Sequence, residues 1–450
     1  MTHTSEQIKV RFPPSPTGLC HVGTARMALL NTLFARKNAG TIVFRSEDTD
    51  RERSKKEFED DIIESLTWLG LSYDSFFRQS ERTAIYTAAI QKLIDEGKAY
   101  LSEEESKKDA GVMVQLVRLK NPGKTVTFAD IIRGDITFDT TELGDFAIAR
   151  ALDDPLYHLA VVIDDADMGI THVIRGEEHI SNTPRQILIQ EALGYPRPQY
   201  AHYPLFLGAD RAKLSKRMGD VSVREYRNQG YLPEALLNFV GTLGWTPPSG
   251  KEILSLAEMI EEFDLADLHK SGAVFDITKL RWYNREYLQQ LSAEEFERYI
   301  APTLQTALEA RNLQYNDLMV QKILPILRER IHISSDIGEM VAEGELDFFF
   351  AEPKPESARI PEKKSNAADA ARHLQHAHDT LIGLSDWNEQ AIKDALWDYA
   401  TEHGRGAVLW PLRYALSARD KSPDPFAIAA IIGKEATLSR INYAIGVLRI

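Results

Sequence analysis

Two short segments of the sequence carry side chains that suit nucleotide chemistry. In the first, RFPPSPTGLCHVGTAR at residues 11–26, three prolines precede His21 and Gly23. Prolines stiffen a loop before any ligand arrives, and the N–H groups at the start of a helix favour phosphate. Because Gly23 has no side chain, a nucleotide can approach the backbone closely. The segment therefore predicts a nucleotide site, although a proline-rich turn with a capping histidine would also explain it.

The second segment, KLSKR at residues 213–217, gathers three cations and one hydroxyl. Cations of this kind stabilise the charge that grows on a triphosphate as pyrophosphate departs. On its own, a basic pentapeptide is more typical of a solvated surface loop. Its interpretation as part of a nucleotide site depends on its pairing with the first segment.

The elements around the first segment follow the order of a parallel α/β fold. The patterning predicts strands over residues 8–12 and 41–45, and helices over residues 21–37 and 62–71. Strand, helix, strand and helix joined by short connections indicate a doubly wound sheet. The proline-rich loop then connects the first strand to the first helix.

The pattern becomes irregular beyond residue 85 and is regular again after residue 155. Turn signals cluster at residues 121–123 and 133–135, so residues 86–155 are predicted to form an insertion. The elements predicted after it are a strand over 158–163, a helix over 184–193 and a strand over 204–207. From Pro233 onward nearly every segment has helical spacing, and residues 351–365, rich in Pro, Lys and Glu, are the best linker candidate.

Composition narrows the class of protein. The chain has 450 residues, enough for two to four domains, and 43% hydrophobic residues are ordinary for a globular protein. Cys20 is the only cysteine, which excludes an internal disulfide and any Cys-rich zinc site. No apolar stretch reaches about 18 residues, and residues 1–10 lack a signal-peptide core. A cytoplasmic protein is therefore expected.

The net charge of −14 argues at first sight against a polyanionic partner. The charge is uneven, however, because residues 1–100 hold 14 basic and 14 acidic side chains. A chain that is acidic overall can still gather positive charge on one face. Composition alone therefore leaves nucleic acid open as a partner.

Together the two segments resemble the paired "HIGH" and "KMSKS" signatures of class I aminoacyl-tRNA synthetases. Further stretches are similar to bacterial glutamyl-tRNA synthetases, namely FRSEDTDRERS (44–54), IRGDITF (132–138), YHLAVVIDDADMGITHVIRGEEHISNTPRQ (157–186) and LPEALLNFVGTLGW (232–245). The resemblance covers most of residues 8–290 and returns in PLRYALSARDKSPDPFAIAAIIGKEATLSRINYAI (411–445). Motifs in this order and at these distances are highly specific.

The resemblance implies a Rossmann-like catalytic domain interrupted by a second domain and followed by helices. The implied domains are the catalytic domain (1–85 plus 156–245), an inserted acceptor-binding domain (86–155), a helical stem-contact region (246–310) and an all-α anticodon-binding domain (311–450). The implied reaction attaches L-glutamate to the 3′ end of tRNA(Glu) through glutamyl-adenylate, with release of pyrophosphate and AMP.

Glutamate carries two carboxylates and one ammonium, so its pocket needs cations and one opposing anion. By their match to family positions, Arg11 and Arg175 are expected to bind carboxylate oxygens and Glu47 the ammonium, with hydrogen bonds from Ser15 and Tyr157. An ion pair with neighbouring acidic residues is the alternative for Arg175. Helix capping is the alternative for Glu47.

The same match assigns residues around ATP. The expected ATP-binding residues are His21, Gly23, Glu178, Lys213, Ser215 and Lys216. Of these, His21, Gly23, Lys213 and Lys216 are expected to be catalytic, with Lys216 as the main stabiliser of the transition state. Position 161 is Val, where some members of the family have an asparagine that touches the amino acid, so it is not counted as a ligand.

The expected substrates and partners are ATP with Mg²⁺, L-glutamate and tRNA(Glu), with no structural zinc, no membrane and a monomeric chain. The alternatives are a form that also charges tRNA(Gln), a glutaminyl-tRNA synthetase, a tRNA-modifying paralogue, a non-catalytic RNA-binding relative and a small-molecule adenylyltransferase. Arg175 favours a carboxylate over an amide, and the helical C-terminal third disfavours the paralogue and the adenylyltransferase.

Overall fold

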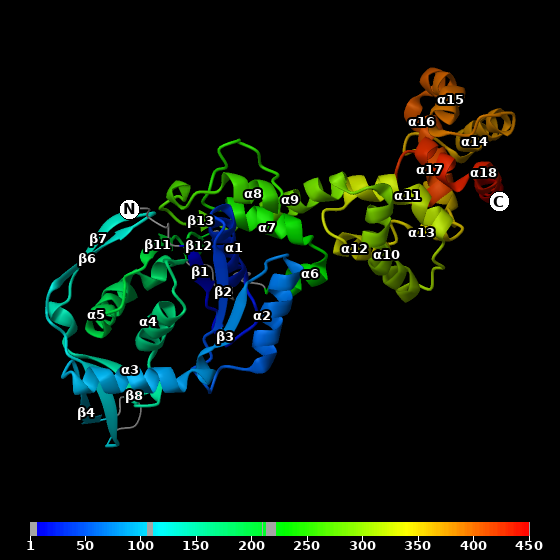
Figure 1. Ribbon diagram of the computed structural model, residues 1–450. Helices are drawn as coiled ribbons and strands as arrows, with labels where there is room; N and C mark the ends of the chain where they lie inside the picture. Colours follow the sequence, from blue (N-terminus) through cyan, green and yellow to red (C-terminus); the bar gives the residue numbers. More distant parts are fainter. Residues whose placement is uncertain (1–6, 106–110, 209, 213–221, 450) are drawn as a thin grey trace. The chain divides into compact units, whose positions relative to one another are not determined.

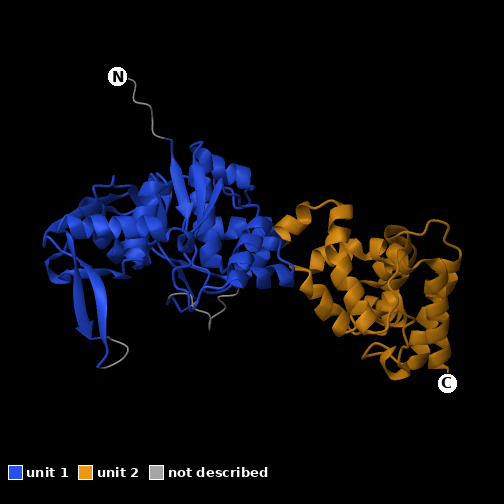
Figure 2. Cartoon of the chain, turned by 60° about the horizontal axis from the view of Figure 1, so that its bottom comes forward, with its two compact units in different colours: residues 1–284 blue, residues 285–450 orange. Residues whose placement is uncertain are grey.

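The structure is a computed structural model that describes residues 7–105, 111–208, 210–212 and 222–449. The chain divides into two compact units, residues 1–284 and residues 285–450, coloured separately in Figure 2.

The first unit begins with the predicted alternation of strands and helices (Figure 1). Its elements are β1 (Lys9–Phe12), α1 (Val22–Lys37), β2 (Thr41–Ser46), α2 (Lys56–Trp68) and β3 (Ser75–Arg78). β2 lies between β1 and β3 and pairs with both in parallel. The strands predicted over 8–12 and 41–45 and the helix predicted over 21–37 are confirmed, whereas α2 begins six residues before the predicted Ile62.

The sequence explains the two ends of α1. The side chain of His21 caps the helix by accepting a hydrogen bond from the Gly23 N–H, and Arg36 and Lys37 lie in its last turn, where cations offset the helix dipole. Gly40 follows because a Cβ there would lie 2.6 Å from the Ile8 carbonyl oxygen. The chain can therefore turn directly from α1 into β2.

The second half of the parallel sheet comes from residues beyond 170. Its elements are β10 (His172–Gly176), the 3-10 helix η3 (Glu177–Asn182), α5 (Thr183–Leu193) and β11 (Gln199–Tyr203). β10 and β11 pair in parallel, and the Thr171 N–H donates to the Lys9 carbonyl at 2.9 Å, which links β10 to β1. The predicted doubly wound parallel architecture is confirmed. It brings the carboxyl ends of β1, β2, β10 and β11 toward one edge.

The predicted strand over residues 158–163 is wrong, because these residues lie in helix α4 (Tyr157–Asp167). Val161, Val162 and Ile163 are β-branched and favour a strand. Every residue from Leu159 to Asp165 is buried, and a fully buried helix has no polar face to reveal its period. The strand predicted over 204–207 shortens to β12 (Phe206–Leu207), which pairs with β13 (Ala273–Val274).

The predicted insertion contains one α-helix and four antiparallel strand pairings. Its elements are α3 (Thr83–Asp95), β4 (Ala99–Glu105), β5 (Met113–Leu119), β6 (Thr125–Asp130), β7 (Gly134–Asp139), β8 (Phe146–Ala151) and β9 (Asp154–Pro155). β4, β5, β8 and β9 form one sheet. β6 pairs with β7 on one side and with β11 on the other, the latter through the residue pair Tyr200–Asp130. The turn predicted at 133–135 lies at residues 131–133, and residues 121–123 belong to the irregular connection between β5 and β6. Gly134, the first residue of β7, has a φ of 81°, which favours glycine.

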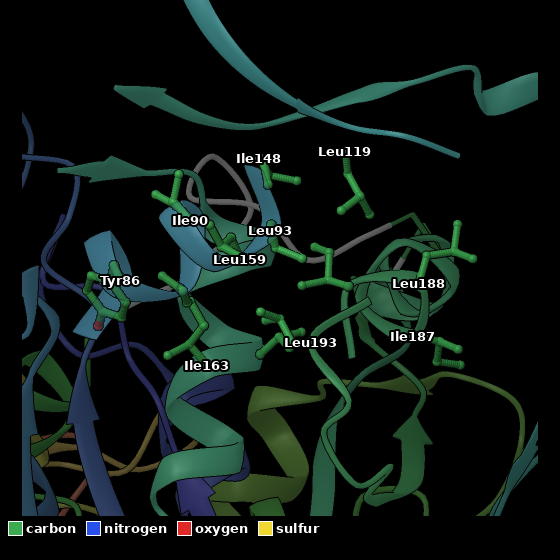
Figure 3. Close-up of a cluster of buried hydrophobic side chains, with 14 of the residues drawn as sticks. Tyr86, Ile90, Leu93, Leu119, Ile148, Leu159, Ile163, Ile187, Leu188 and Leu193 are labelled. Atoms are coloured by element: carbon green, nitrogen blue, oxygen red, sulfur yellow. The ribbon is translucent and has the colours of Figure 1, made fainter. Parts of the chain in front are cut away.

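One hydrophobic cluster joins the insertion to the helices of the sheet (Figure 3). Ile90 and Leu93 of α3 belong to this cluster together with Leu159 and Ile163 of α4. Leu159 and Ile163 are four residues apart, the spacing of side chains on one face of a helix. Ile148 of β8 and Leu188 of α5 belong to the same cluster. Burying these apolar side chains fixes α4, and therefore Tyr157 at its first position, against the rest of the first unit.

The rest of the chain is helical, as predicted from Pro233 onward. The first unit continues with α6 (Val223–Gln229), α7 (Pro233–Thr242) and α8 (Leu256–Glu262), and α9 (Ile277–Gln290) crosses the boundary between the units. The helices of the second unit are α10 (Ala293–Ala310), α11 (Asp317–Arg330), α12 (Ser335–Ala342), α13 (Asp347–Phe350), α14 (Ala367–Ile382), α15 (Glu389–His403), α16 (Arg405–Ser417), α17 (Pro425–Ile432) and α18 (Lys434–Leu448).

Local signals place several of these helices. Ser292 and Glu295 exchange hydrogen bonds as a capping box at the start of α10. The predicted linker, residues 351–365, joins α13 to α14 within the second unit and contains one short 3-10 turn. Within the described part of the chain, none of the helices has the length and apolar character needed to cross a bilayer.

Candidate active site

The largest concentration of predicted site residues surrounds a cavity of about 480 Å³ in the first unit. It lies where β1, β2, β10 and β11 end and where α1 begins. Eight predicted residues line it: Arg11, Ser15, His21, Gly23, Glu47, Tyr157, Arg175 and Glu178. Lys213, Ser215 and Lys216 lie outside the described residues. Segments separated by more than 150 residues in sequence thus meet in one cavity.

The proline-rich segment forms the wall next to α1. Pro13, Pro14 and Ser15 line the cavity before the chain reaches His21. The His21 Nδ1 accepts a hydrogen bond from the Gly23 N–H at 3.1 Å, and a Cβ at position 23 would lie 3.0 Å from the His21 ring. The capping role considered for His21 is therefore real. It coexists with a place in the cavity wall beside the positive end of the α1 dipole.

The residues just after the second basic segment are attached to this wall. Ser222 forms an isolated antiparallel bridge with His21, and the Val223 N–H donates to the Cys20 carbonyl oxygen at 2.8 Å. Ser222 also caps α6 through its side chain. The chain that leaves residues 213–221 is thus fixed beside the first segment.

Two buried arginines provide positive charge in the cavity. Arg11 is 1% exposed and donates from Nε to Asp165 at 3.3 Å; Arg175 is 4% exposed and donates from Nε to His202 at 3.0 Å. In both side chains the Nη1 atom is buried and has no hydrogen-bond partner among the residues described. Buried guanidinium donors of this kind are costly unless an acceptor satisfies them. The pair therefore favours an anionic ligand such as a carboxylate.

Glu47 supplies the opposite charge. It is buried, and Arg45, whose side chain is fully buried behind it, contacts it at 3.1 Å. Burial raises the pKa of Glu47 to about 7, although Arg45 and Arg11 oppose the increase. Glu47 is therefore a carboxylate for which a bound ammonium group would be a favourable partner.

A charge network behind the cavity was not predicted from the sequence. Arg45 contacts Asp165 at 2.7 Å and Asp164 at 3.8 Å as well as Glu47, and Asp165 also binds Arg11. Burial alone would lower the pKa of Arg45, but these three carboxylates outweigh it and raise the pKa. Asp165 thus links the cationic and anionic parts of the cavity wall. The apolar sequence before Asp164 gave no sign that both aspartates are buried.

His179 and Tyr203 also line the cavity and were not singled out by the sequence. The His179 Nδ1 is 3.3 Å from the Tyr157 hydroxyl and 3.0 Å from the Asn182 amide nitrogen. Burial and the nearby Arg175 lower the pKa of His179 to about 3, so its imidazole is neutral. Burial also raises the pKa of Tyr157, which keeps its hydroxyl protonated.

A second, larger cavity of about 730 Å³ adjoins the first. The two share Ser15, Thr17, Glu47 and Tyr157, and the second extends along residues 49–53 and 150–156. Its wall mixes arginines with acidic side chains. Within the described ranges, no group of three or more His, Cys, Asp or Glu side chains could hold a metal ion.

Comparisons with known proteins agree with this arrangement. Residues 7–108 and 101–282 match the family "tRNA synthetases class I (E and Q), catalytic domain", and residues 280–445 match an "Anticodon binding domain". The chain is 39% identical to glutamate–tRNA ligase 1 of Caldanaerobacter subterraneus subsp. tengcongensis, over 98% of both chains. It is 43% identical to the glutamate–tRNA ligase of Aquifex aeolicus, over 76% of this chain and 79% of that one.

Solved structures give the same result. A crystal structure of a glutamate tRNA ligase from Elizabethkingia meningosepticum, in complex with its amino acid, superposes with a TM-score of 0.86 at 34% identity. A glutamate–tRNA synthetase from Elizabethkingia anophelis gives a TM-score of 0.85 at 33% identity. Each alignment covers 98% of this chain and the whole of the other chain.

Proposed function

Because the chain belongs to the class I tRNA synthetases for glutamate and glutamine, we propose that it joins L-glutamate to the 3′ end of tRNA(Glu) at the expense of ATP. The observation that carries this assignment is the composition of the 480 Å³ cavity. Two buried arginines, whose Nη1 atoms have no hydrogen-bond partner among the described residues, and one buried glutamate match the two carboxylates and the ammonium of L-glutamate. Glutamine would leave one of the charged donors with a weaker partner.

Glutamate is proposed to lie between Arg11, Arg175 and Glu47. The two arginines bind its carboxylate oxygens, Glu47 receives its ammonium, and Ser15 and Tyr157 add hydrogen bonds. All five side chains line the cavity, which supports a common ligand. The α-carboxylate must reach ATP near the start of α1, so Arg175 is assigned to the side-chain carboxylate.

ATP is proposed to lie against His21, Gly23 and Glu178, with Lys213, Ser215 and Lys216 around its phosphates. An α-carboxylate oxygen of glutamate attacks the α-phosphorus, which forms the mixed anhydride and releases pyrophosphate. The terminal 2′-hydroxyl of the tRNA then attacks the glutamyl carbonyl, and AMP leaves with the bonding electron pair. Rate comes from positioning and from cations that neutralise the developing charge, chiefly Lys216.

Mg²⁺ is proposed to arrive as part of the ATP substrate. The described side chains include no group of three metal ligands, so a site built by the protein alone is not supported and no step is assigned to one. For the same reason, and because Cys20 is the only cysteine, no structural zinc is proposed.

The tRNA is proposed to contact the chain in the order of its domains. The insertion (86–155) binds the acceptor end, residues 246–310 bind the stem and residues 311–450 bind the anticodon. The adjoining 730 Å³ cavity offers the 3′ end a route to the glutamate, because the two cavities share Glu47 and Tyr157. The working form is proposed to be a cytoplasmic monomer, which sedimentation of the purified chain tests.

The test is an aminoacylation assay with purified protein, radiolabelled amino acid, ATP, Mg²⁺ and each purified tRNA. ATP-dependent attachment of glutamate to tRNA(Glu), with formation of AMP and pyrophosphate, is expected. Attachment of glutamate to tRNA(Gln) as well would identify a form that charges both tRNAs. Attachment of glutamine, or no attachment to any tRNA, would contradict the proposed function.

A further inference from the structure

A chain of three buried side chains extends from the insertion to the cavity. The His202 Nδ1 of β11 is 2.6 Å from the Asp130 carboxylate at the end of β6, and the His202 Nε2 is 3.0 Å from the Arg175 Nε. Asp130, His202 and Arg175 are 4%, 0% and 4% exposed. The roles proposed above use Arg175 but leave Asp130 and His202 without a function.

The partners of His202 fix the position of its proton. An ionised Asp130 can only accept hydrogen bonds, so the Nδ1 of His202 carries the proton and donates it. Burial lowers the pKa of His202 and the nearby Arg175 adds to the effect; Asp130 opposes the decrease without reversing it, so the ring is neutral. The Nε2 is therefore an acceptor, and it receives the N–H of the Arg175 Nε.

Asp130 is itself held in place. Its carboxylate accepts the backbone N–H groups of Ile132 and Arg133 at 3.0 Å each and that of His202 at 3.1 Å. These bonds hold the carboxylate in its charged form. The IRGDITF stretch noted in the sequence begins with Ile132, so its turn fixes the carboxylate that orients His202.

Thr183 completes the support of Arg175. Its Oγ1 accepts the Arg175 Nη2 at 2.8 Å and is 3.1 Å from the His179 carbonyl oxygen and 3.3 Å from the His202 Nε2. Because a hydroxyl has one proton, donation to that carbonyl leaves the oxygen lone pairs for Arg175. The Nε and Nη2 of Arg175 are thus both engaged. The Nη1 remains without a partner among the described residues.

We propose that Asp130 and His202 are positioning residues that hold the guanidinium plane of Arg175 with Nη1 directed to the carboxylate of the substrate. They touch Arg175 and not the ligand cavity, in whose wall only Arg175 of the three takes part. Because His202 and Thr183 occupy Nε and Nη2, the Nη1 N–H groups are the donors left for the carboxylate, and their direction depends on the orientation of the guanidinium plane. Asp130 and His202 therefore contribute to the preference for glutamate over glutamine. This inference rests on the proposed function.

The test compares two substitutions of His202. In His202→Gln, an amide oxygen can accept from Arg175 while the amide N–H donates to Asp130; His202→Phe retains the ring shape without either hydrogen bond. Loss of a hydrogen bond to a charged group should raise the KM for glutamate about 10- to 100-fold in His202→Phe. The KM for ATP should stay unchanged, and the ratio of kcat/KM for glutamate over glutamine should fall. His202→Gln should stay within about threefold of the unsubstituted protein.

His172 provides a matched control. It is also a buried histidine, on the neighbouring strand β10, and it packs against Phe34 outside the cavity. His172→Phe should leave the KM for glutamate unchanged. If His202→Phe left this KM unchanged, or raised the KM values of glutamate and ATP alike, Asp130 and His202 would have a purely structural role.

Nitrogen-15 NMR of histidine-labelled protein tests the proton position independently of activity. The His202 signals are assigned as those absent from the spectrum of His202→Gln. Their chemical shifts should show a protonated Nδ1 and an unprotonated Nε2. The opposite tautomer, or a cationic ring, would overturn the proposal even if His202→Phe failed to fold. Glutamylation by the unsubstituted protein is measured in the same series, so a failure of the proposed function is seen separately.

Discussion

Replacement of Arg175 by methionine should weaken the recognition of L-glutamate selectively. The Arg175 side chain is buried, and its Nε and Nη2 bind His202 and Thr183 at 3.0 and 2.8 Å. The Nη1 is left for a ligand, since no described residue pairs with it. Methionine occupies much of the same apolar volume but has no donor for a carboxylate.

The size of the effect follows from the interactions that are lost. A hydrogen bond to a charged group contributes about 1.5–3 kcal/mol, and about 1.36 kcal/mol corresponds to one factor of ten. The kcat/KM for glutamate should therefore fall about 10- to 150-fold. Arg11 still faces the same cavity, so binding should be weakened and not abolished.

The assay is steady-state aminoacylation of tRNA(Glu) with glutamate and with ATP as the varied substrate. Arg36→Met is the matched control, because Arg36 forms a partly exposed ion pair with Asp74 outside the cavity. The loss in Arg175→Met should be confined to glutamate, with the KM for ATP unchanged. An Arg175→Met protein that charges tRNA with unchanged kcat/KM for glutamate would refute the assignment of this arginine to the substrate.

Further predictions concern the other groups of the site. Lys216→Ala should raise the activation barrier by about 2.7–4 kcal/mol if it acts as one preorganised donor, and an unchanged single-turnover rate of adenylate formation would remove that role. The pKa of Glu47 is about 7, so its carboxylate forms as the pH rises from 6 to 8. The affinity for glutamate should therefore increase with pH, up to about tenfold per pH unit below that pKa. Calorimetric titration should show this increase in the native protein and not in Glu47→Gln. The Cys20 thiol is buried, and burial together with Asp61 raises its pKa to about 12, so a disulfide reagent at pH 8 should react after unfolding and not before. Elemental analysis of the purified protein should detect no stoichiometric zinc.

The sequence predicted the elements whose signals are local. Prolines, a capping histidine and a glycine define the connection between β1 and α1 in the sequence itself. In α1, Leu29, Leu30 and Leu33 are all buried, as are the residues between them. The residues expected to bind glutamate and ATP were located by resemblance, and the described ones meet in one cavity because parallel strands end at the same edge.

Features that depend on tertiary environment could not be predicted. Residues 159–165 of helix α4 are all buried, so Val161 to Ile163 had the composition of a strand and no helical period. Asp165 and Arg45 form one ion-pair network although 120 positions separate them, and His202 lies in a strand that has no strong local pattern. A sequence shows which charges exist, whereas burial and pairing decide which of them face a ligand.

The most direct test of the glutamate site is a crystal structure of this protein with L-glutamate bound. The side-chain carboxylate should lie within hydrogen-bonding distance of the Nη1 atom of Arg175, with Arg11 contacting a carboxylate and the ammonium on the Glu47 carboxylate. Glutamate bound away from these residues, or bound in the reverse direction with its ammonium next to the arginines, would contradict the account.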